Sequence, residues 1–150
     1  MATIELRSPA FSDHAAIPTR FTKDGEDLSP PLEWSGVPEG TAELALLCED
    51  PDAPGGTFVH WVLSGLDASL SGLGEGEKPP GAVEGTNDYG HTGYGGPRPP
   101  AGDDPHRYFF RLYAAADPLG LSPGGSADDL RRALVRTELA RGTVVGTYQR

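Results

Sequence analysis

Residues 85–116 read GTNDYGHTGYGGPRPPAGDDPHRYFFRLYAAA, and this stretch decides the fold. Its first part holds six glycines and four prolines, more than a regular element tolerates. From His106 onward the sequence alternates as a strand does, with His106, Tyr108, Phe110 and Leu112 on one face. We therefore expect a glycine- and proline-rich loop to deliver His106 and Tyr108 to a sheet, at the polar mouth of an apolar core.

Two apolar runs upstream predict neighbouring strands. The run Glu43–Cys48 is typical of a strand buried on both faces. Residues 49–54, EDPDAP, follow it directly, and their two prolines restrict the backbone, so the carboxylates are expected at a rigid corner. The alternative is a turn whose acids are solvated. The run Thr57–Leu63 predicts a second strand, which groups His60 with Phe58 and Val62; an isolated histidine there is by default a satisfied core residue.

The remaining patterns are shorter. Ser126, with Asp129 three residues later, predicts the N-cap of a single helix that continues to Arg141 and is closed by Gly142. The other expected elements are strands over Thr3–Phe11, Ile17–Phe21 and Thr143–Tyr148, with Ser64–Gly85 as a loose surface connection. Many short strands with one helix near the C-terminus favour a mostly β fold, an antiparallel β-sandwich, over an α/β fold.

Composition narrows the class of protein. The chain has 150 residues, which predicts one domain over residues 1–150, and a net charge of −10 that disfavours nucleic acid and anionic membranes. Its N-terminus lacks a signal-peptide pattern and no apolar run is long enough to insert in a membrane, so we expect a cytoplasmic protein. The single cysteine, Cys48, lies in an apolar run and is expected to be a buried free thiol.

The polar residues of the predicted strands suit a small oxyanion. His60, His106 and the tyrosines Tyr94 and Tyr108 supply donors, while the Asp50-Pro51-Asp52 corner supplies a carboxylate that fixes a histidine tautomer. An alternative is a metal or acid–base set made of His60, His106, Asp50 and Asp52, since two imidazoles and a carboxylate hold zinc or iron. Against an enzyme, the sequence has no closely spaced histidine pair and no activated nucleophile.

Long motifs carry a resemblance to a known family. They are residues 50–54 (DPDAP) with 58–61 (FVHW), and residues 93–100 (GYGGPRPP) with 106–110 (HRYFF); residues 28–34 (LSPPLEW) and 87–90 (NDYG) add support. In these motifs the chain resembles the phosphatidylethanolamine-binding proteins, also called Raf-kinase-inhibitor-like proteins, in their compact bacterial and archaeal branch.

The resemblance implies Greek-key connections and a small pocket for phosphate-like head groups. Its implied ligand-binding residues are Asp50, Asp52, Pro54, His60, Pro99, Pro100, His106 and Tyr108, with Tyr94 and Gly96 in the adjoining loop. In family terms His60 and His106 would donate to the anion and Asp50 would be their polar partner. Arg98 departs from eukaryotic relatives, which have a small residue there; it adds a cation near the mouth or points into solvent.

The resemblance also implies the class of function. We expect a non-enzymatic binding or regulatory protein with no cofactor or metal, whose partner is a small anion such as phosphate or phosphorylethanolamine. One alternative is a protease or kinase inhibitor that binds a protein partner through the proline-rich rim. The other is a metal-dependent hydrolase. The sequence ends after its last predicted strand, without the C-terminal helix of animal members, and compact relatives often pair, so a homodimer is expected.

Overall fold

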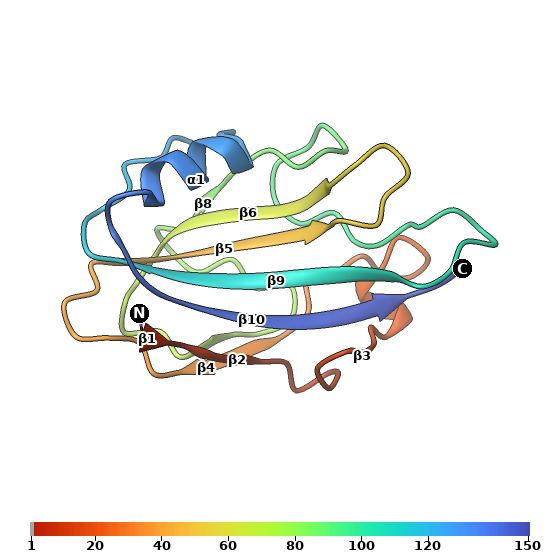
Figure 1. Ribbon diagram of the computed structural model, residues 1–150, viewed down its shortest axis with the longest axis horizontal. Coiled ribbons are helices and arrows are strands. Elements are labelled where there is room, and N and C mark those ends of the chain that lie inside the picture. The colour runs from red at the N-terminus through yellow and green to blue at the C-terminus, as the bar shows by residue number, and fades with distance from the viewer. Residues whose placement is uncertain (1) are drawn as a thin grey trace.

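The computed structural model describes residues 2–150, and its strands form two sheets that face each other (Figure 1). The large sheet has the strand order β1-β10-β9-β5-β6-β8, and β3 pairs with β10 beside this path. Its strands are β1 (Ala2–Thr3), β3 (Ala15–Ala16), β5 (Glu43–Asp50), β6 (Phe58–Leu66), β8 (Val83–Glu84), β9 (His106–Ala115) and β10 (Glu138–Tyr148). Strands β5, β6 and β8 lie side by side in chain order, and the chain then returns as β9 on the other side of β5, which is a Greek-key arrangement.

The small sheet covers one face of the large sheet. It consists of β2 (Glu5–Arg7), β4 (Leu32–Ser35) and β7 (Gly72–Leu73), in the order β2-β4-β7. Between the sheets lies the main core, to which the small sheet contributes Trp34 and the large sheet contributes alternate residues of its central strands. In β9 these are Tyr108, Phe110 and Leu112, as the alternation predicts. The predicted mostly β sandwich is therefore confirmed.

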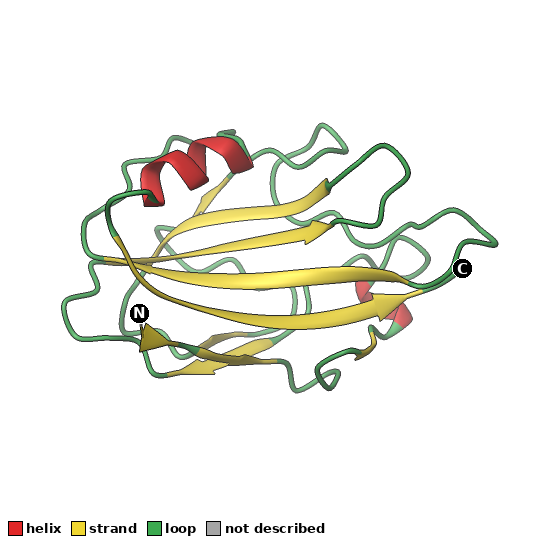
Figure 2. Ribbon diagram, in the orientation of Figure 1, coloured by secondary structure: helices red, strands yellow, loops and turns green. Residues whose placement is uncertain are grey.

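The other face of the large sheet is covered by the helix α1 (Ala127–Leu134), which Figure 2 shows in red. Leu130 and Leu134 pack there against Leu47 and Tyr113. The predicted capping box is present: the Ser126 hydroxyl accepts from the amide of Asp129, and the Asp129 carboxylate accepts from the amide of Ser126. Strand β9 is thus buried on both faces over its second half.

Four boundaries differ from the sequence prediction. Thr3–Phe11 is not one strand: β1 ends at Thr3 in the large sheet, β2 ends at Arg7 in the small sheet, and residues 8–11 form no strand, since Pro9 lacks the N–H needed to continue the ladder. The helix ends at Leu134 instead of Arg141, because the following residues pair with β9 from Glu138 onward, and tertiary pairing overrides local helix propensity. Ile17–Phe21 is not a strand: after β3, Pro18 lacks the N–H needed for a ladder and the chain forms the 3-10 helix η1 (Thr19–Phe21). Ser64–Gly85 is not simply a loose connection, since it carries the end of β6 together with β7 and β8.

Long loops meet at one end of the sandwich. The loop between β5 and β6 and the loop between β8 and β9 lie at the end of the large sheet where the C-terminus also lies (Figures 1 and 2). In residues 2–150 no helix is long and apolar enough to cross a membrane.

Candidate functional site

A cavity of about 220 Å³ lies at this end of the sandwich. It is lined by Asp50, Ala53, Pro54, Phe58, His60, Tyr89, Arg98, Pro99, Pro100, His106 and Tyr108. A larger groove of about 670 Å³ runs along β4 and β7, but its only ionisable side chains, Arg7 and Glu33, pair with each other at 3.4 Å. The smaller cavity is therefore the better candidate, because ionisable side chains from three strands and one loop converge on it.

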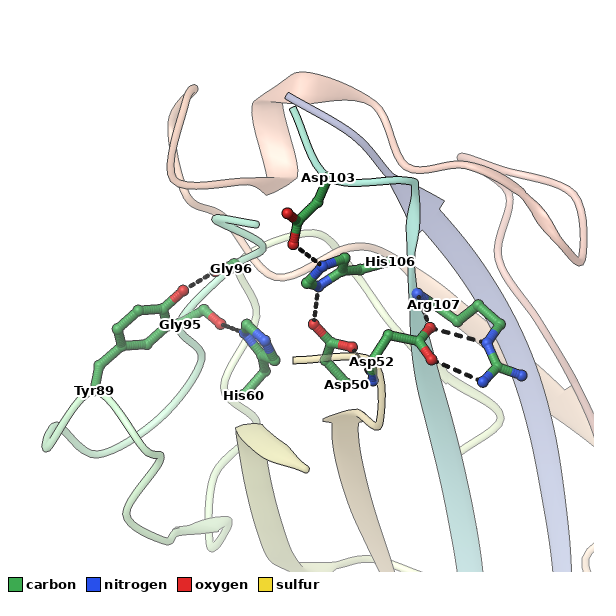
Figure 3. Close-up of polar contacts among 9 residues, drawn as sticks. All are labelled: Asp50, Asp52, His60, Tyr89, Gly95, Gly96, Asp103, His106 and Arg107. Carbon is green, nitrogen blue, oxygen red and sulfur yellow. Dashed lines mark hydrogen bonds and ion pairs between the residues drawn. The ribbon is translucent and has the colours of Figure 1, made fainter. Parts of the chain in front are cut away.

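His106 forms the centre of the polar wall, at the first residue of β9. Its Nδ1 lies 2.6 Å from Oδ2 of Asp50, at the end of β5, and its Nε2 lies 3.0 Å from Oδ2 of Asp103, in the loop before β9 (Figure 3). The side chains of His106 and Asp50 are 5% and 4% exposed. Both ring nitrogens thus face carboxylates, an arrangement that suits an imidazolium donating two N–H groups.

Two opposing effects set the charge of His106. Burial lowers its pKa, but the hydrogen bonds and charges of Asp50 and Asp103 outweigh burial and raise the pKa above the ordinary histidine value. Asp103 is partly exposed, so one of the two carboxylates can move away while the other is fixed in the strand.

Asp50 is fixed because Asp52 anchors the turn that follows it. The Asp52 amide donates to Oδ1 of Asp50 at 2.7 Å. The Asp52 carboxylate accepts from the Arg107 amide at 2.9 Å and from the Arg107 guanidinium at 2.9 and 2.8 Å. These hydrogen bonds to Arg107 lower the pKa of Asp52. Asp52 therefore ties β5 to β9 and holds Asp50 against His106, outside the lining of the cavity.

A β-bulge directs His60 toward the cavity. Trp61 pairs with Cys48 and Val59 pairs with Glu49, so His60, between them, has no partner on β5. The extra residue changes the alternation: Trp61 packs in the main core, whereas Val59 packs on the helix side. The predicted grouping of His60 with Val62 is therefore wrong, since Val62 also packs on the helix side, but the pairing of His60 with Phe58 holds.

The proton of His60 lies on the nitrogen that faces the protein. Nδ1 is 2.6 Å from the carbonyl oxygen of Gly95, which only accepts, so Nδ1 must be the donor. Burial lowers the pKa of His60 although its contact with Gly95 opposes this, which favours the neutral ring. The ring is held edge-on to Tyr108, with centroids 5.1 Å apart.

Two polar atoms reach the cavity without a partner. Neither His60 Nε2 nor Tyr108 Oη forms a side-chain hydrogen bond within residues 2–150. Every side-chain nitrogen or oxygen of those residues that is fully shielded from solvent does have a hydrogen-bond partner. These two atoms are therefore not fully shielded from solvent. Since both residues are otherwise buried and line the cavity, the atoms are exposed to the cavity. Burial is also the main cause of the raised pKa of Tyr108, which stays a neutral phenol.

Tyr89 and Arg98 complete the rim. The Tyr89 hydroxyl donates to the carbonyl oxygen of Gly96 at 2.7 Å, and burial raises the Tyr89 pKa to about 12. Arg98 is exposed, and its positive charge acts to lower the pKa of Tyr89. Arg98 lines the cavity, so of its two predicted orientations the one near the mouth applies, and within the described part of the chain it forms no ion pair.

Seven of the ten predicted site residues line the cavity: Asp50, Pro54, His60, Pro99, Pro100, His106 and Tyr108. The other three do not line it. Asp52 pairs with Arg107, and the Tyr94 hydroxyl donates to the carbonyl oxygen of Phe21 at 2.6 Å. Gly96 shapes the wall, because a Cβ there would lie 2.6 Å from the Phe21 carbonyl oxygen. These three residues support the cavity without lining it.

Sequence reasoning missed three lining residues. Phe58 shares a face with His60, so the alternation could have identified it. Ala53 lies inside the quoted DPDAP motif but has no polar group. Tyr89 lies in a loop, where no periodicity indicates the direction of a side chain, and the neighbouring Tyr94 was expected instead.

The alternative metal set is not formed. No group of three or more histidine, cysteine, aspartate or glutamate side chains in residues 2–150 is placed to hold a metal ion. His106 contacts Asp50 and Asp103 through both nitrogens, while His60 contacts Gly95.

The fold and the cavity together define a class of β-sandwich proteins with a small pocket at one end of the sheet, lined mainly by apolar side chains with a few ionisable groups among them. The sequence profile of the phosphatidylethanolamine-binding proteins matches residues 7–149, and the chain belongs to this family. It is 45% identical over 152 residues to a UPF0098 protein of Methanothermobacter thermautotrophicus, with 98% of this chain and 99% of that protein covered.

Two solved structures are similar over nearly the whole chain. The phosphatidylethanolamine-binding protein homologue CT736 of Chlamydia trachomatis has a TM-score of 0.93 and 36% identity, covering 99% of this chain and 98% of its own. YbcL of E. coli, described as a member of the mammalian family, has a TM-score of 0.92 and 32% identity, covering 99% of both chains. LppC of Mycobacterium tuberculosis, named as a candidate lipoprotein, is 39% identical over 97% of this chain and 72% of its own length.

Proposed function

We propose that this chain is a non-enzymatic binding or regulatory protein whose cavity accepts a small phosphate-like anion. The observation that carries the proposal is the pair of polar atoms, Tyr108 Oη and His60 Nε2, that face the cavity without partners in the described residues. A ligand oxygen accepts from Tyr108 Oη, and a ligand hydroxyl donates to Nε2 of a neutral His60. Membership of a family named for binding phosphatidylethanolamine supports the same class of ligand.

Charge at the site favours an anion. Arg98 supplies an unpaired cation at the rim, whereas the positive charge that the raised pKa of His106 favours is opposed by the carboxylates of Asp50 and Asp103. Asp50 does not offer a free carboxylate to an ammonium group, since Oδ1 accepts from Asp52 and Oδ2 contacts His106. The phosphate part of a head group is therefore the part that the cavity is proposed to recognise.

Titration calorimetry with inorganic phosphate tests the proposal, using Tyr108→Phe and Tyr113→Phe as a matched pair. Both residues lie on β9, but Tyr108 faces the cavity and Tyr113 packs on the helix side of the sheet. A hydrogen bond to a charged group contributes about 1.5–3 kcal/mol, so Tyr108→Phe should weaken binding about 10- to 100-fold. Equal binding by the two variants, or no saturable binding by the unmodified protein, would refute the proposal.

Two further properties stay proposals with tests of their own. A cytoplasmic location is tested by fractionating the source cells, and recovery in the membrane or the medium would contradict it. A homodimer is tested by light scattering of the purified chain, whose mass is 15.8 kDa. A mass that stays at one chain across concentrations would exclude the dimer.

A further inference from the structure

A second pocket, of about 180 Å³, shares no lining residue with the anion cavity. It lies among β6, β8, the segment between η1 and β4, and the segment between β7 and β8. The lining residues that matter for recognition are Asp27, Ser29, Trp61, Glu77, Lys78 and Glu84.

This pocket contains a buried donor without a partner. Trp61 is 2% exposed, and its indole ring is held edge-on by Tyr94, with centroids 5.3 Å apart. Its Nε1–H forms no hydrogen bond in residues 2–150, although every side-chain nitrogen there that is fully shielded from solvent has a partner. Because Trp61 lines this pocket, its N–H is open to the pocket and can donate only to a group that enters it.

A second buried polar group, the hydroxyl of Ser29, also lacks a partner. Ser29 is 7% exposed, and its hydroxyl forms no hydrogen bond in the described chain. Its backbone carbonyl accepts from the Gly76 amide at 2.9 Å, which holds two sides of the pocket together. The pocket thus offers a ligand oxygen two donors, because a serine hydroxyl donates as well as accepts.

The carboxylates of Glu77 and Glu84 retain free oxygens. Oε1 of Glu77 accepts from the Gly74 amide at 2.7 Å, and Oε1 of Glu84 lies 3.5 Å from Nζ of Lys78. The other oxygen of each carboxylate has no hydrogen bond or ion pair among the described residues. Both side chains can therefore accept from a ligand.

The charge of the pocket favours a cation. Asp27 is already engaged, since its oxygens accept from the Gly96 amide and from Nζ of Lys23, each at 2.7 Å. When Lys23 is counted with Lys78, the three carboxylates of the pocket face two ammonium groups, which leaves one negative charge. In residues 2–150 no group of three or more histidine, cysteine, aspartate or glutamate side chains is placed to hold a metal ion, so an organic cation fits better.

We propose that this pocket is a second binding site, for a small primary ammonium compound that carries a carbonyl or hydroxyl oxygen. The oxygen accepts from Trp61 Nε1, and the ammonium group donates to the free oxygens of Glu77 and Glu84. The volume limits the ligand to several non-hydrogen atoms, since one water occupies about 30 Å³ of the liquid. The site is independent of the anion cavity, so either one can fail its test alone.

NMR of the ¹⁵N-labelled protein tests the site, because the chain has only two tryptophans and each gives one indole N–H signal. The probe is glycinamide at a pH of about 6.5, below the ordinary pKa of an α-amino group. The Trp61 signal should shift and saturate. The Trp34 signal should not move, since its N–H donates to the Leu70 carbonyl at 2.8 Å. Trp34→Phe assigns the two signals, and equal shifts of both, or no saturation at Trp61, would overturn the proposal.

Two analogues of glycinamide test the ligand class. Acetamide keeps the oxygen without the charge, and ethylammonium keeps the charge without the oxygen. Each should bind about three- to tenfold more weakly than glycinamide, as expected for the loss of one polar contact. Equal binding of acetamide would show that the carboxylates do not take part, and equal binding of ethylammonium would show that the indole N–H does not; either result would overturn the assignment.

Glu84→Gln tests the carboxylates with little change of shape. Removing one partly exposed charge should weaken glycinamide binding about two- to fivefold. Glu39→Gln, in the exposed turn before β5, removes the same charge outside the pocket and should leave binding unchanged. Unchanged binding in Glu84→Gln, or equal weakening in the two variants, would refute a role for this pocket.

Discussion

Replacing Asp50 by asparagine perturbs the buried pair at the centre of the polar wall. Asparagine keeps the shape of the side chain and can still accept the Asp52 amide at the position of Oδ1. At the position of Oδ2 it places an NH₂ group or a neutral oxygen against Nδ1 of His106, where a carboxylate now lies at 2.6 Å. A hydrogen bond between charged groups is lost in a place that is 4–5% exposed, where solvent screens little.

The expected magnitude follows from that contact. A hydrogen bond to a charged group contributes about 1.5–3 kcal/mol, so Asp50→Asn should lower the free energy of unfolding by about this amount while His106 is protonated. The pKa of His106 is lowered by burial but raised overall by Asp50 and Asp103. A group with a raised folded pKa stabilises the protein fully below its unfolded pKa, about 6.5 for histidine. This stabilisation is lost as the pH rises through the folded pKa.

Urea denaturation, followed by fluorescence of the buried Trp34 and Trp61, measures this free energy. The loss in Asp50→Asn should be largest near a pH of about 5.5 and smaller near a pH of about 9. Asp104→Asn is the control. It removes one negative charge close to His106 in the sequence, and the Asp104 side chain forms no hydrogen bond or ion pair within residues 2–150. An equal loss at both pH values, or a His106 pKa at or below 6.5 by NMR titration, would refute the argument.

Three other substitutions have defined outcomes. Asp103→Asn removes the carboxylate 3.0 Å from His106 Nε2 and should tighten phosphate binding about tenfold relative to Asp104→Asn in calorimetry; an unchanged affinity would show that Asp103 does not compete with the ligand. Ser126→Ala removes the N-cap of α1 and should lower the free energy of unfolding by about 1 kcal/mol in urea denaturation; a change near zero would contradict the capping box. Gly142→Ala places a methyl group against a backbone carbonyl oxygen and should destabilise by about 1–3 kcal/mol, whereas a neutral effect would contradict the close approach.

Much of the site could be predicted because strand alternation is a local property. The period of two places His106 and Tyr108 on one face of β9, and the structure has them there. The proximity of Asp50 and His106, which are 56 residues apart, requires β5 and β9 to be neighbours. The sequence makes both strands recognisable, but only the pairing of the strands determines this contact, so its geometry was not predictable from the pattern.

The errors arise where tertiary contacts override local pattern. The bulge at His60 depends on the pairing of β6 with β5, so alternation alone assigned Val62 to the wrong face. The predicted helix was too long because the residues after Leu134 have helical propensity but pair with β9. Tyr94 and Tyr89 lie in a glycine-rich loop whose conformation depends on specific contacts, such as that of Tyr89 with the Gly96 carbonyl.

The most direct test of the anion cavity is an NMR titration of the isotope-labelled protein with inorganic phosphate, in which backbone amides and histidine ring nitrogens are followed together. We expect saturable shift changes at His60, Tyr108 and Arg98, which lie around the cavity, with a single dissociation constant. Changes that do not saturate, or that are confined to the exposed arginines of α1 such as Arg132, would show that phosphate does not bind in the cavity.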